Sequence, residues 1–138
     1  MNDVEIFIHG AGVAYKKLKD IEDNYNNVYV TGKYDFTQSA KLYSETDVLY
    51  ALYPTSSIQY RTSYPVKFFE AIITKTPIIV NKGTVLEDFV NKYNIGFAVD
   101  GSNIKEIKKT TDYINNNRHI LDEKFMNLEK IQYDYSWE

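Results

Sequence analysis

The sequence predicts an α/β fold, an open parallel sheet of about five strands with helices on both faces. Short β-branched runs alternate with longer amphipathic stretches at intervals of roughly 20 residues, a pattern typical of strand–helix–strand units. The chain has 138 residues, of which 43% are hydrophobic and 25% charged, and this favours one globular domain over a disordered segment. No apolar run approaches the ~20 residues that a membrane-spanning helix needs.

The first two strands are predicted close to the N-terminus. The run Val4–Ile8 is apolar and ends at Gly10-Ala11-Gly12, which suits a tight strand-to-helix turn. A helix is expected over about residues 13–24, because its apolar residues share one face. The second strand, residues 28–31, is closed by Gly32.

The middle of the chain adds a short helix and a third strand. Residues 36–46 are predicted to be helical, with Ala40 and Tyr43 facing inward. Residues 47–53 are nearly all apolar, so this strand is expected to be buried on both faces.

Two further strand–helix units follow a polar loop. The loop is predicted over residues 54–64, and the helix 65–74 has a proline near its first turn, where a missing N–H costs little. A fourth strand at 77–80, a helix at 84–93 and a fifth strand at 96–99 come next.

The C-terminal part is predicted to consist of two helices. Ser102 is expected to cap a helix that runs through Ile114. The asparagines at 115–117 are expected to break that helix, and the last helix is expected over about residues 120–133.

Composition excludes several function classes. The formal net charge is −3, so the basic footprint of a nucleic-acid-binding protein is missing and no nucleic-acid partner is expected. There are no cysteines, which excludes disulfides and thiolate chemistry and fits a cytoplasmic setting. The two histidines, His9 and His119, are far apart in the sequence, which argues against a histidine-built metal site.

Ligands of open α/β sheets bind beyond the carboxyl ends of the strands, and three segments are predicted to lie there. The Gly10–Gly12 turn would let a ligand approach the backbone, although a plain turn explains it equally well. The loop 54–64 is long, rich in hydroxyls and leads into a helix N-terminus that favours a phosphate, whereas an ordinary polar loop is the alternative. Lys82-Gly83-Thr84 precedes another helix N-terminus.

Glu70 is the strongest single candidate. It lies in an otherwise apolar stretch, where an ionised carboxylate needs a partner. A structural role, with the side chain reaching solvent or pairing with Lys67, is favoured by periodicity alone. In the functional alternative, the carboxylate accepts hydrogen bonds from two vicinal hydroxyls of a ribose.

The ordered motifs resemble those of a known family. The segments 65–72 and 76–80 resemble the P-x-K-x-x-E-A and G-x-P-V/I-V motifs of the donor-binding, C-terminal domain of GT-B glycosyltransferases of the retaining group 1 family. Further segments resemble other motifs of that family in matching order, over nearly the whole chain: 6–12, 28–34, 42–49, 83–87, 94–99 and 135–138.

The resemblance implies a role for each matching residue. Glu70 would hold the ribose hydroxyls of a nucleotide-sugar donor, and residues 62–65 would run past its diphosphate and sugar. Glu70 matches the second of the family's pair of glutamates and Thr62 stands where the first would be, and Lys67 would approach a phosphate or pair with Glu70. The donor-binding residues that the resemblance implies are Thr62, Ser63, Tyr64, Pro65, Lys67, Glu70, Gly10, Gly12, Gly32, Lys33, Tyr34, Gly83 and Thr84.

The resemblance also implies partners and a setting. Residues 1–138 are expected to be one Rossmann-like domain of a two-domain enzyme, without the acceptor-binding N-terminal domain and the family's first strand, so the fragment alone is expected to be inactive. Without that strand the sheet order becomes flavodoxin-like, 2-1-3-4-5. The acceptor is expected to be a glycan or a lipid-linked glycan of surface polysaccharide synthesis. The resemblance further implies a cytoplasmic location, at the inner face of the membrane, with peripheral membrane association of the full protein and a homodimer. It implies no cofactor and no metal, with the nucleotide sugar as substrate.

Two alternatives stay open. The first is a non-catalytic, flavodoxin-like docking or regulatory module, which Thr62 in place of a glutamate favours slightly. The second is a nucleotide-sugar epimerase of the same architecture, although no epimerase-specific motif is present.

Overall fold

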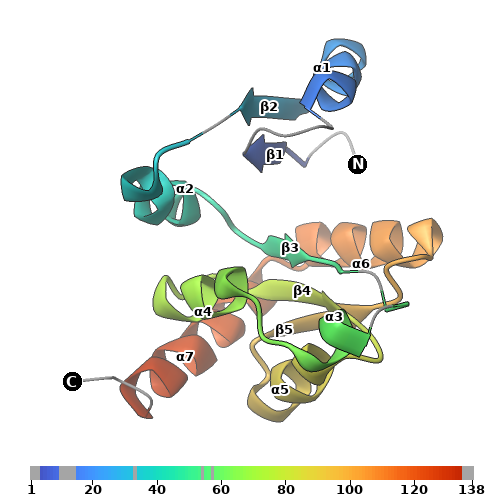
Figure 1. Ribbon diagram of the computed structural model, residues 1–138. Helices are drawn as coiled ribbons and strands as arrows, with labels where there is room; N and C mark the ends of the chain where they lie inside the picture. The colour runs from blue at the N-terminus through green and yellow to red at the C-terminus, as the bar shows by residue number, and fades with distance from the viewer. Residues whose placement is uncertain (1–3, 10–14, 33, 54, 57, 135–138) are drawn as a thin grey trace. The chain divides into compact units, whose positions relative to one another are not determined.

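The fold is described from a computed structural model, which covers residues 4–9, 15–32, 34–53, 55–56 and 58–134 (Figure 1). Strands alternate with helices along this part of the chain, and each strand pair is parallel. The α/β class with helices on both sides of parallel strands is therefore confirmed. The chain divides into two compact units, Met1–Lys41 and Leu42–Glu138, and each is described by itself. The single domain expected over residues 1–138 stays a prediction.

The first unit contains a two-stranded parallel sheet. Strand β1 (Ile6–His9) pairs with β2 (Val28–Gly32), and helix α1 (Tyr15–Asn24) connects them. Helix α1 ends at Asn24, as its asparagine-rich turn predicts. The second unit begins within α2 (Ser39–Ser44), which follows a short 3₁₀ helix, η1 (Phe36–Gln38).

The second unit is built on a three-stranded parallel sheet in the order β3-β4-β5. The strands are β3 (Leu49–Ala51), β4 (Ile78–Asn81) and β5 (Gly96–Val99). The helices are α3 (Ile58–Thr62), α4 (Val66–Ile73), α5 (Val85–Tyr93), α6 (Ile104–Asn116) and α7 (His119–Asp134). The predicted order 2-1-3-4-5 contains both observed sets of neighbours, and the pairing of β1 with β3 that it also requires stays a prediction.

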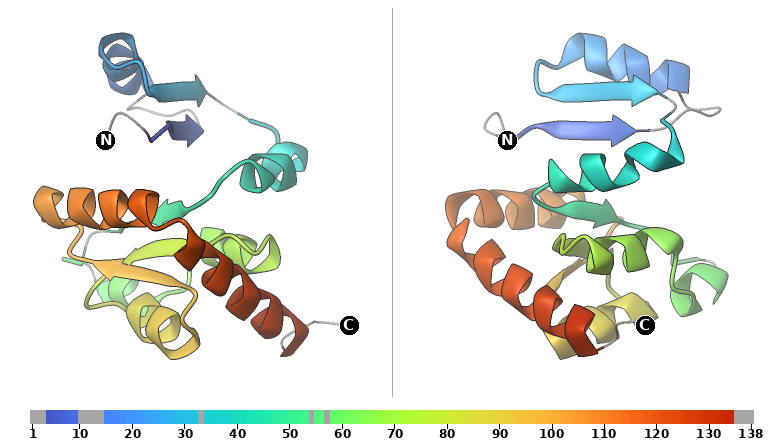
Figure 2. Two further views of the ribbon diagram at one scale, coloured as in Figure 1. Left: turned by 180° about the vertical axis from the view of Figure 1, so that it is seen from behind. Right: turned by 90° about the vertical axis from the view of Figure 1, so that its left-hand side faces the viewer.

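Helices cover both faces of the β3-β4-β5 sheet because β4 alternates its side chains between two apolar clusters (Figures 1 and 2). Ile78 and Val80 pack with residues of α4, α5 and α7 on one face. Ile79 packs with Ile114 of α6 on the other. Every residue of β4 is buried, as expected for the central strand of a parallel sheet.

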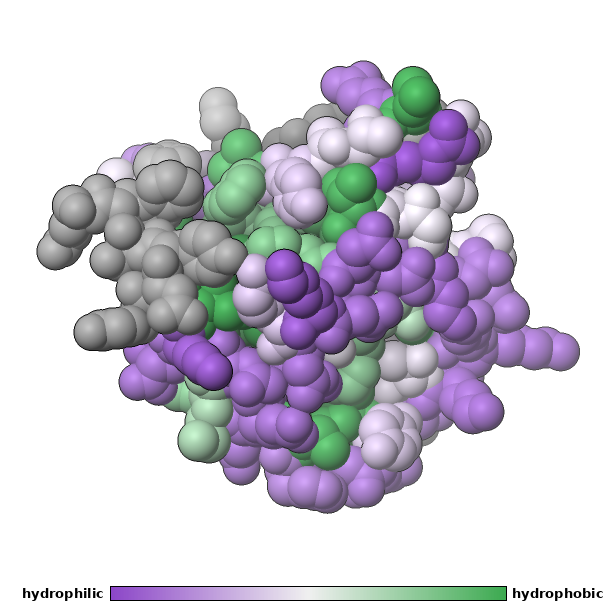
Figure 3. Space-filling view, turned by 90° about the horizontal axis from the view of Figure 1, so that it is seen from below, coloured by the Kyte–Doolittle hydropathy of each residue, from purple (hydrophilic) through white to green (hydrophobic). Residues whose placement is uncertain are grey.

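The surface is mostly polar where Figure 3 shows it. Hydrophilic side chains cover most of that face, and the apolar ones are scattered among them (Figure 3). Apolar residues scattered in this way are normal on a folded protein and mark no site. In the part of the chain that the structure describes, no helix has the length and apolar character of a membrane span.

Several predicted elements differ in detail from the structure. The third strand is shorter than residues 47–53, and Tyr50 is 38% exposed at this edge strand, so the expectation of burial on both faces is wrong. The loop expected over 54–64 contains α3. The helix expected over 36–46 begins as η1, and Ala40 is exposed rather than inward.

The predicted cap of α6 differs from the structure, whereas its predicted end at the asparagines 115–117 is confirmed. Asn103, not Ser102, caps α6, because the Asn103 side chain accepts from the Glu106 N–H at 3.1 Å while Ser102 bonds to Asp100. Helix α6 continues to Asn116 and ends at Asn117.

Candidate functional site

The carboxyl ends of β3, β4 and β5 form the edge where ligands of parallel α/β sheets bind. Because the three strands are parallel, the segments that follow them leave the sheet at this one edge. Helix α5 begins directly beyond β4 and α6 directly beyond β5, while the segment after β3 leads through α3 into α4. All the candidate residues described below, except those of the first unit, belong to these connections.

The segment after β3 is ordered by its own contacts. Thr62 is the last residue of α3, and its hydroxyl donates to the Ile58 carbonyl at 2.8 Å. Tyr64 contacts Phe68 and Phe89, with ring centroids 5.6 and 6.2 Å apart, and thereby packs the start of α4 against α5. Ser63, between them, is half-buried.

No side chain caps the first turn of helix α4. Pro65 is its N-cap residue in an extended conformation, and its carbonyl accepts from the Phe68 N–H at 3.0 Å. The N–H groups before Phe68 have no acceptor within the helix, so they can donate to an anion. Lys67 lies in the same turn with its side chain exposed.

Glu70 lies in the second turn of α4, half-buried among apolar neighbours. Its main-chain carbonyl accepts from the Thr74 N–H and hydroxyl. Within the described residues, its carboxylate has no hydrogen-bond or ion-pair partner, and the pairing with Lys67 that the structural interpretation offered is not formed. Solvent exposure on one side remains, so the carboxylate is available to a ligand.

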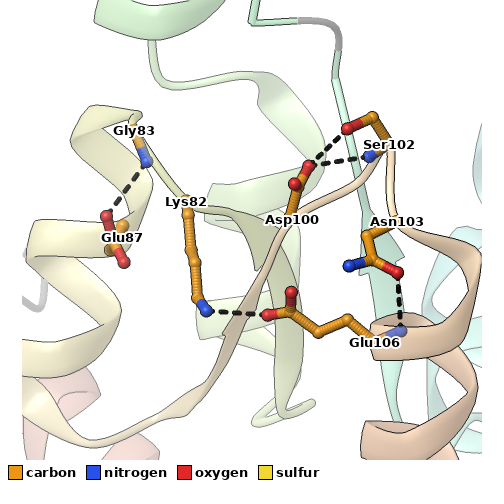
Figure 4. Close-up of polar contacts among 7 residues, drawn as sticks. All are labelled: Lys82, Gly83, Glu87, Asp100, Ser102, Asn103 and Glu106. Atoms are coloured by element: carbon orange, nitrogen blue, oxygen red, sulfur yellow. Dashed lines mark hydrogen bonds and ion pairs between the residues drawn. The ribbon is translucent and has the colours of Figure 1, made fainter.

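The turn after β4 is held by hydrogen bonds on both sides. Gly83 has a φ of +80°, a conformation that side chains other than glycine rarely adopt, and its N–H donates to the Glu87 Oε1 atom at 3.0 Å. Thr84 is the buried N-cap residue of α5, and its hydroxyl donates to the Asn81 carbonyl at 2.8 Å instead of capping the helix. Lys82 reaches across to α6 (Figure 4).

Charged groups link the ends of β4 and β5 (Figure 4). Lys82 Nζ lies 2.7 Å from Glu106 Oε1, and this hydrogen bond raises the pKa of Lys82 and lowers that of Glu106. The Ser102 hydroxyl and N–H both donate to Asp100, which lowers the pKa of the Asp100 carboxyl. These groups are therefore ionised at neutral pH and already paired.

Asn81 joins all three strand ends and was not predicted from the sequence. It is the last residue of β4 and is 5% exposed. Its amide donates to the Tyr53 carbonyl beyond β3, and its Oδ1 atom lies against Gly101 beyond β5. A buried asparagine at the end of a β-branched strand was the available signal.

The first unit holds the other predicted residues. Gly32 ends β2 with a φ of +80°, and Tyr34 is partly exposed with its ring edge-on to His9. His9 Nδ1 lies 2.6 Å from the Thr31 hydroxyl, the bonded structural role that a strand-end histidine commonly has. Gly10, Gly12 and Lys33 lie outside the described residues.

The arrangement is suited to binding rather than to covalent catalysis. The strand-end edge of the second unit offers the Glu70 carboxylate, hydroxyls and helix N–H groups. Among the described residues no cluster of acidic or histidine side chains could hold a metal ion. Such groups recognise hydroxyl-rich and phosphorylated ligands.

The fold and this edge define a parallel α/β domain of the class that binds ligands beyond its strand ends. The sequence profile of the family "Glycosyl transferases group 1" matches residues 1–131, so the chain belongs to the group 1 glycosyltransferases. The resemblance inferred from the motifs is thereby confirmed, and the chain carries a glycosyltransferase domain, which favours the transferase interpretation over the docking-module and epimerase alternatives. No curated protein matches the chain closely enough to count as a relative.

Proposed function

We propose that this domain binds the nucleotide-sugar donor of a sugar transfer, with Glu70 accepting hydrogen bonds from the two ribose hydroxyls. The observation that supports this most is Glu70, a half-buried residue of an apolar helix whose carboxylate has no protein partner within the described residues. A ribose supplies two adjacent O–H donors, which match the two oxygens of one carboxylate.

The donor diphosphate would lie at the first turn of α4. Its N–H groups and the positive end of the helix dipole stabilise negative charge, and Lys67 adds a cation one turn before Glu70. During transfer the bond between the anomeric carbon and the diphosphate oxygen breaks. The acceptor hydroxyl oxygen bonds to the anomeric carbon with retention of configuration, and its proton passes to the leaving diphosphate. The domain would stabilise the charge that develops on the leaving diphosphate.

The finer parts of the proposal concern the partners. The acceptor is a glycan or a lipid-linked glycan, and the donor binds without a metal ion. Thr62 stands where the family has a glutamate close to the transferred sugar, and its hydroxyl is engaged by the Ile58 carbonyl. The sugar would therefore be held by fewer charged contacts than in relatives that have both glutamates.

Calorimetric titration of the 138-residue chain with UDP, GDP and ADP tests the proposal. Saturable binding of one nucleotide, equal in EDTA and in Mg²⁺, is expected. Because hydrogen bonds to a charged group contribute about 1.5–3 kcal/mol, Glu70→Gln should weaken that binding roughly 10- to 100-fold. Glu129→Gln, the same charge change on the exposed side of α7, should leave the affinity unchanged.

Each outcome decides part of the proposal. Failure of all three nucleotides to bind would overturn donor binding by this chain. Equal affinity in wild type and Glu70→Gln would remove Glu70 from the site. A Glu70→Gln variant that no longer folds, seen as a lost thermal transition, would instead support the structural role.

A further inference from the structure

The Asn81 side chain contacts the segments that follow two other strands, β3 and β5. It ends β4 at the centre of the three-stranded sheet, and its backbone pairs with Val99 of β5. Its 5% exposure means that its amide group is removed from water and needs its partners inside the protein.

Each end of the Asn81 amide meets a different segment. The Nδ2 group donates to the carbonyl of Tyr53, the residue that begins the connection to α3 and α4. The Oδ1 atom packs against Gly101 so closely that a Cβ atom at position 101 would overlap it. Glycine at 101 is therefore required by the amide, and not by an unusual backbone angle, since the positive φ values of described glycines are at Gly32 and Gly83.

The main chain of Asn81 holds a third segment. Its carbonyl accepts from the buried hydroxyl of Thr84, the N-cap residue of α5. The connections that follow β3, β4 and β5 thus all touch one residue. These are the connections that carry the start of α4, the 82–84 turn and the start of α6.

We infer that Asn81 is a positioning residue for the donor site, setting the spacing of the three strand-end segments so that their binding groups face one ligand together. This inference rests on the proposed function. Asn81 itself is buried beneath the segments and does not need to touch the nucleotide. Misplacing a group by about 1 Å can lower an enzyme's rate as much as 100-fold. A small shift of these segments would in the same way misplace the binding groups and weaken nucleotide binding.

A double-mutant cycle on nucleotide affinity tests the inference. Asn81→Ala removes the amide, and Gly101→Ala introduces a Cβ atom that pushes the amide away. Each is expected to weaken nucleotide binding about tenfold. The double variant should bind no more weakly than Asn81→Ala alone, because the new Cβ atom no longer meets a side chain.

A control separates positioning from general loss of stability. Leu128 is 0% exposed on α7 and belongs to the core cluster that contains Ile78 and Val80, so Leu128→Ala lowers the free energy of unfolding by about 2–5 kcal/mol. Measured at a temperature where every variant is folded, Leu128→Ala is expected to keep the wild-type affinity. Amide hydrogen exchange at residues 55–56 and 101–103 should be faster in Asn81→Ala and unchanged in Leu128→Ala.

The possible failures are distinguishable. If wild type binds no nucleotide, the proposed function falls and this inference with it. If wild type binds and Asn81→Ala binds equally well, the inference alone is overturned. Additive losses in the double variant, or an equal loss in Leu128→Ala, would also overturn it.

Discussion

The two compact units differ sharply in how much apolar surface they bury. Among the described residues, Val30 is the only fully buried hydrophobic side chain of Met1–Lys41, whereas Leu42–Glu138 contains two apolar clusters around its sheet. The first unit instead exposes aromatic rings such as Phe7, at 49%, and Tyr29, at 39%, which stack on each other. Hydrophobic burial is the main stabilising term in folding, so the second unit holds most of the stability.

Local hydrogen bonds give the first unit much of its order. The Glu22 carboxylate accepts from the Val30 N–H and pairs with Lys19, which together lower the pKa of Glu22. Asn27 donates to the Val4 carbonyl at 2.9 Å. The proposed ribose contact lies in the second unit, where the surrounding core holds the strand ends rigidly.

The largest expected effect is a loss of core packing in the second unit. Phe68 is 1% exposed and packs edge-on against Phe89, so Phe68→Ala should lower the free energy of unfolding by about 3–5 kcal/mol. Phe7→Ala removes the same ring from the exposed face of the first unit and should cost less than about 1.5 kcal/mol. Urea unfolding followed by circular dichroism measures both, and equal losses would contradict the contrast between the units.

The next largest effect concerns the close approach of β4 and β5. A Cβ atom at Gly96 would overlap the Ile78 carbonyl, so Gly96→Ala should destabilise by about 1–3 kcal/mol. Gly83→Ala meets no atom within 4 Å but places alanine at a φ of +80°, and it should cost about 1–2 kcal/mol through backbone strain alone. Thermal unfolding compares the pair, and a larger loss in Gly83→Ala would contradict the steric explanation.

Amide hydrogen exchange compares the units without any substitution. Amides in β4 should open only through global unfolding, whereas amides in β2 should exchange through local opening of the first unit. A difference of about 1.4 kcal/mol in opening free energy gives a tenfold difference in the protection of amides from exchange. We expect the amides of β4 to be protected at least tenfold more than those of β2. Equal protection in the two strands would show that the units unfold together.

The smallest effect is a pH dependence within the second unit. Lys124 is 8% exposed, donates to Asn94 and lies 4.9 Å from the centre of the Phe97 ring; burial lowers its pKa. The unfolded state therefore binds more protons at alkaline pH, and this lysine makes stability rise with pH between its folded and unfolded pKa values. The stability of wild type relative to Lys124→Met should accordingly increase from pH 7 to pH 10.

A lysine on the outer side of the same helix provides the control for that pH series. Lys130 is exposed, so Lys130→Met removes the same charge without emptying a buried position and controls for the change in net charge. If the stability difference between wild type and Lys124→Met does not change with pH, the prediction is wrong. The partners of the Lys124 ammonium would then fully offset the cost of burying it.

The sequence predicts the elements well where local patterns decide them. The strand at 96–99 is found at those residues, and α4 and α5 begin within one residue of their predicted starts, because Pro65 and Thr84 mark helix beginnings. Glu70 was identifiable because a charge in an apolar helix is conspicuous. The family was recognisable from the order of its motifs.

The sequence does not predict features that depend on contacts formed only in the folded chain. Ser102 and Asn103 are both good capping residues, and the choice depends on Asp100 taking the Ser102 hydroxyl. An asparagine at the end of a β-branched strand was the signal for Asn81, but the sequence could not show its partners, because Tyr53 and Gly101 reach it only in the folded sheet. The exposure of Tyr50 depends on β3 being an edge strand of its sheet.

The central claim is that a donor nucleotide binds at the carboxyl ends of β3, β4 and β5. Backbone amide chemical shifts of the ¹⁵N-labelled chain, recorded during titration with the nucleotide that binds in calorimetry, test it most directly. We expect the largest shifts at residues 62–70, 82–84 and 100–103, and small ones along α7. Shifts concentrated on α7 or the outer face of α6, with residues 62–70 unchanged, would contradict the proposed site.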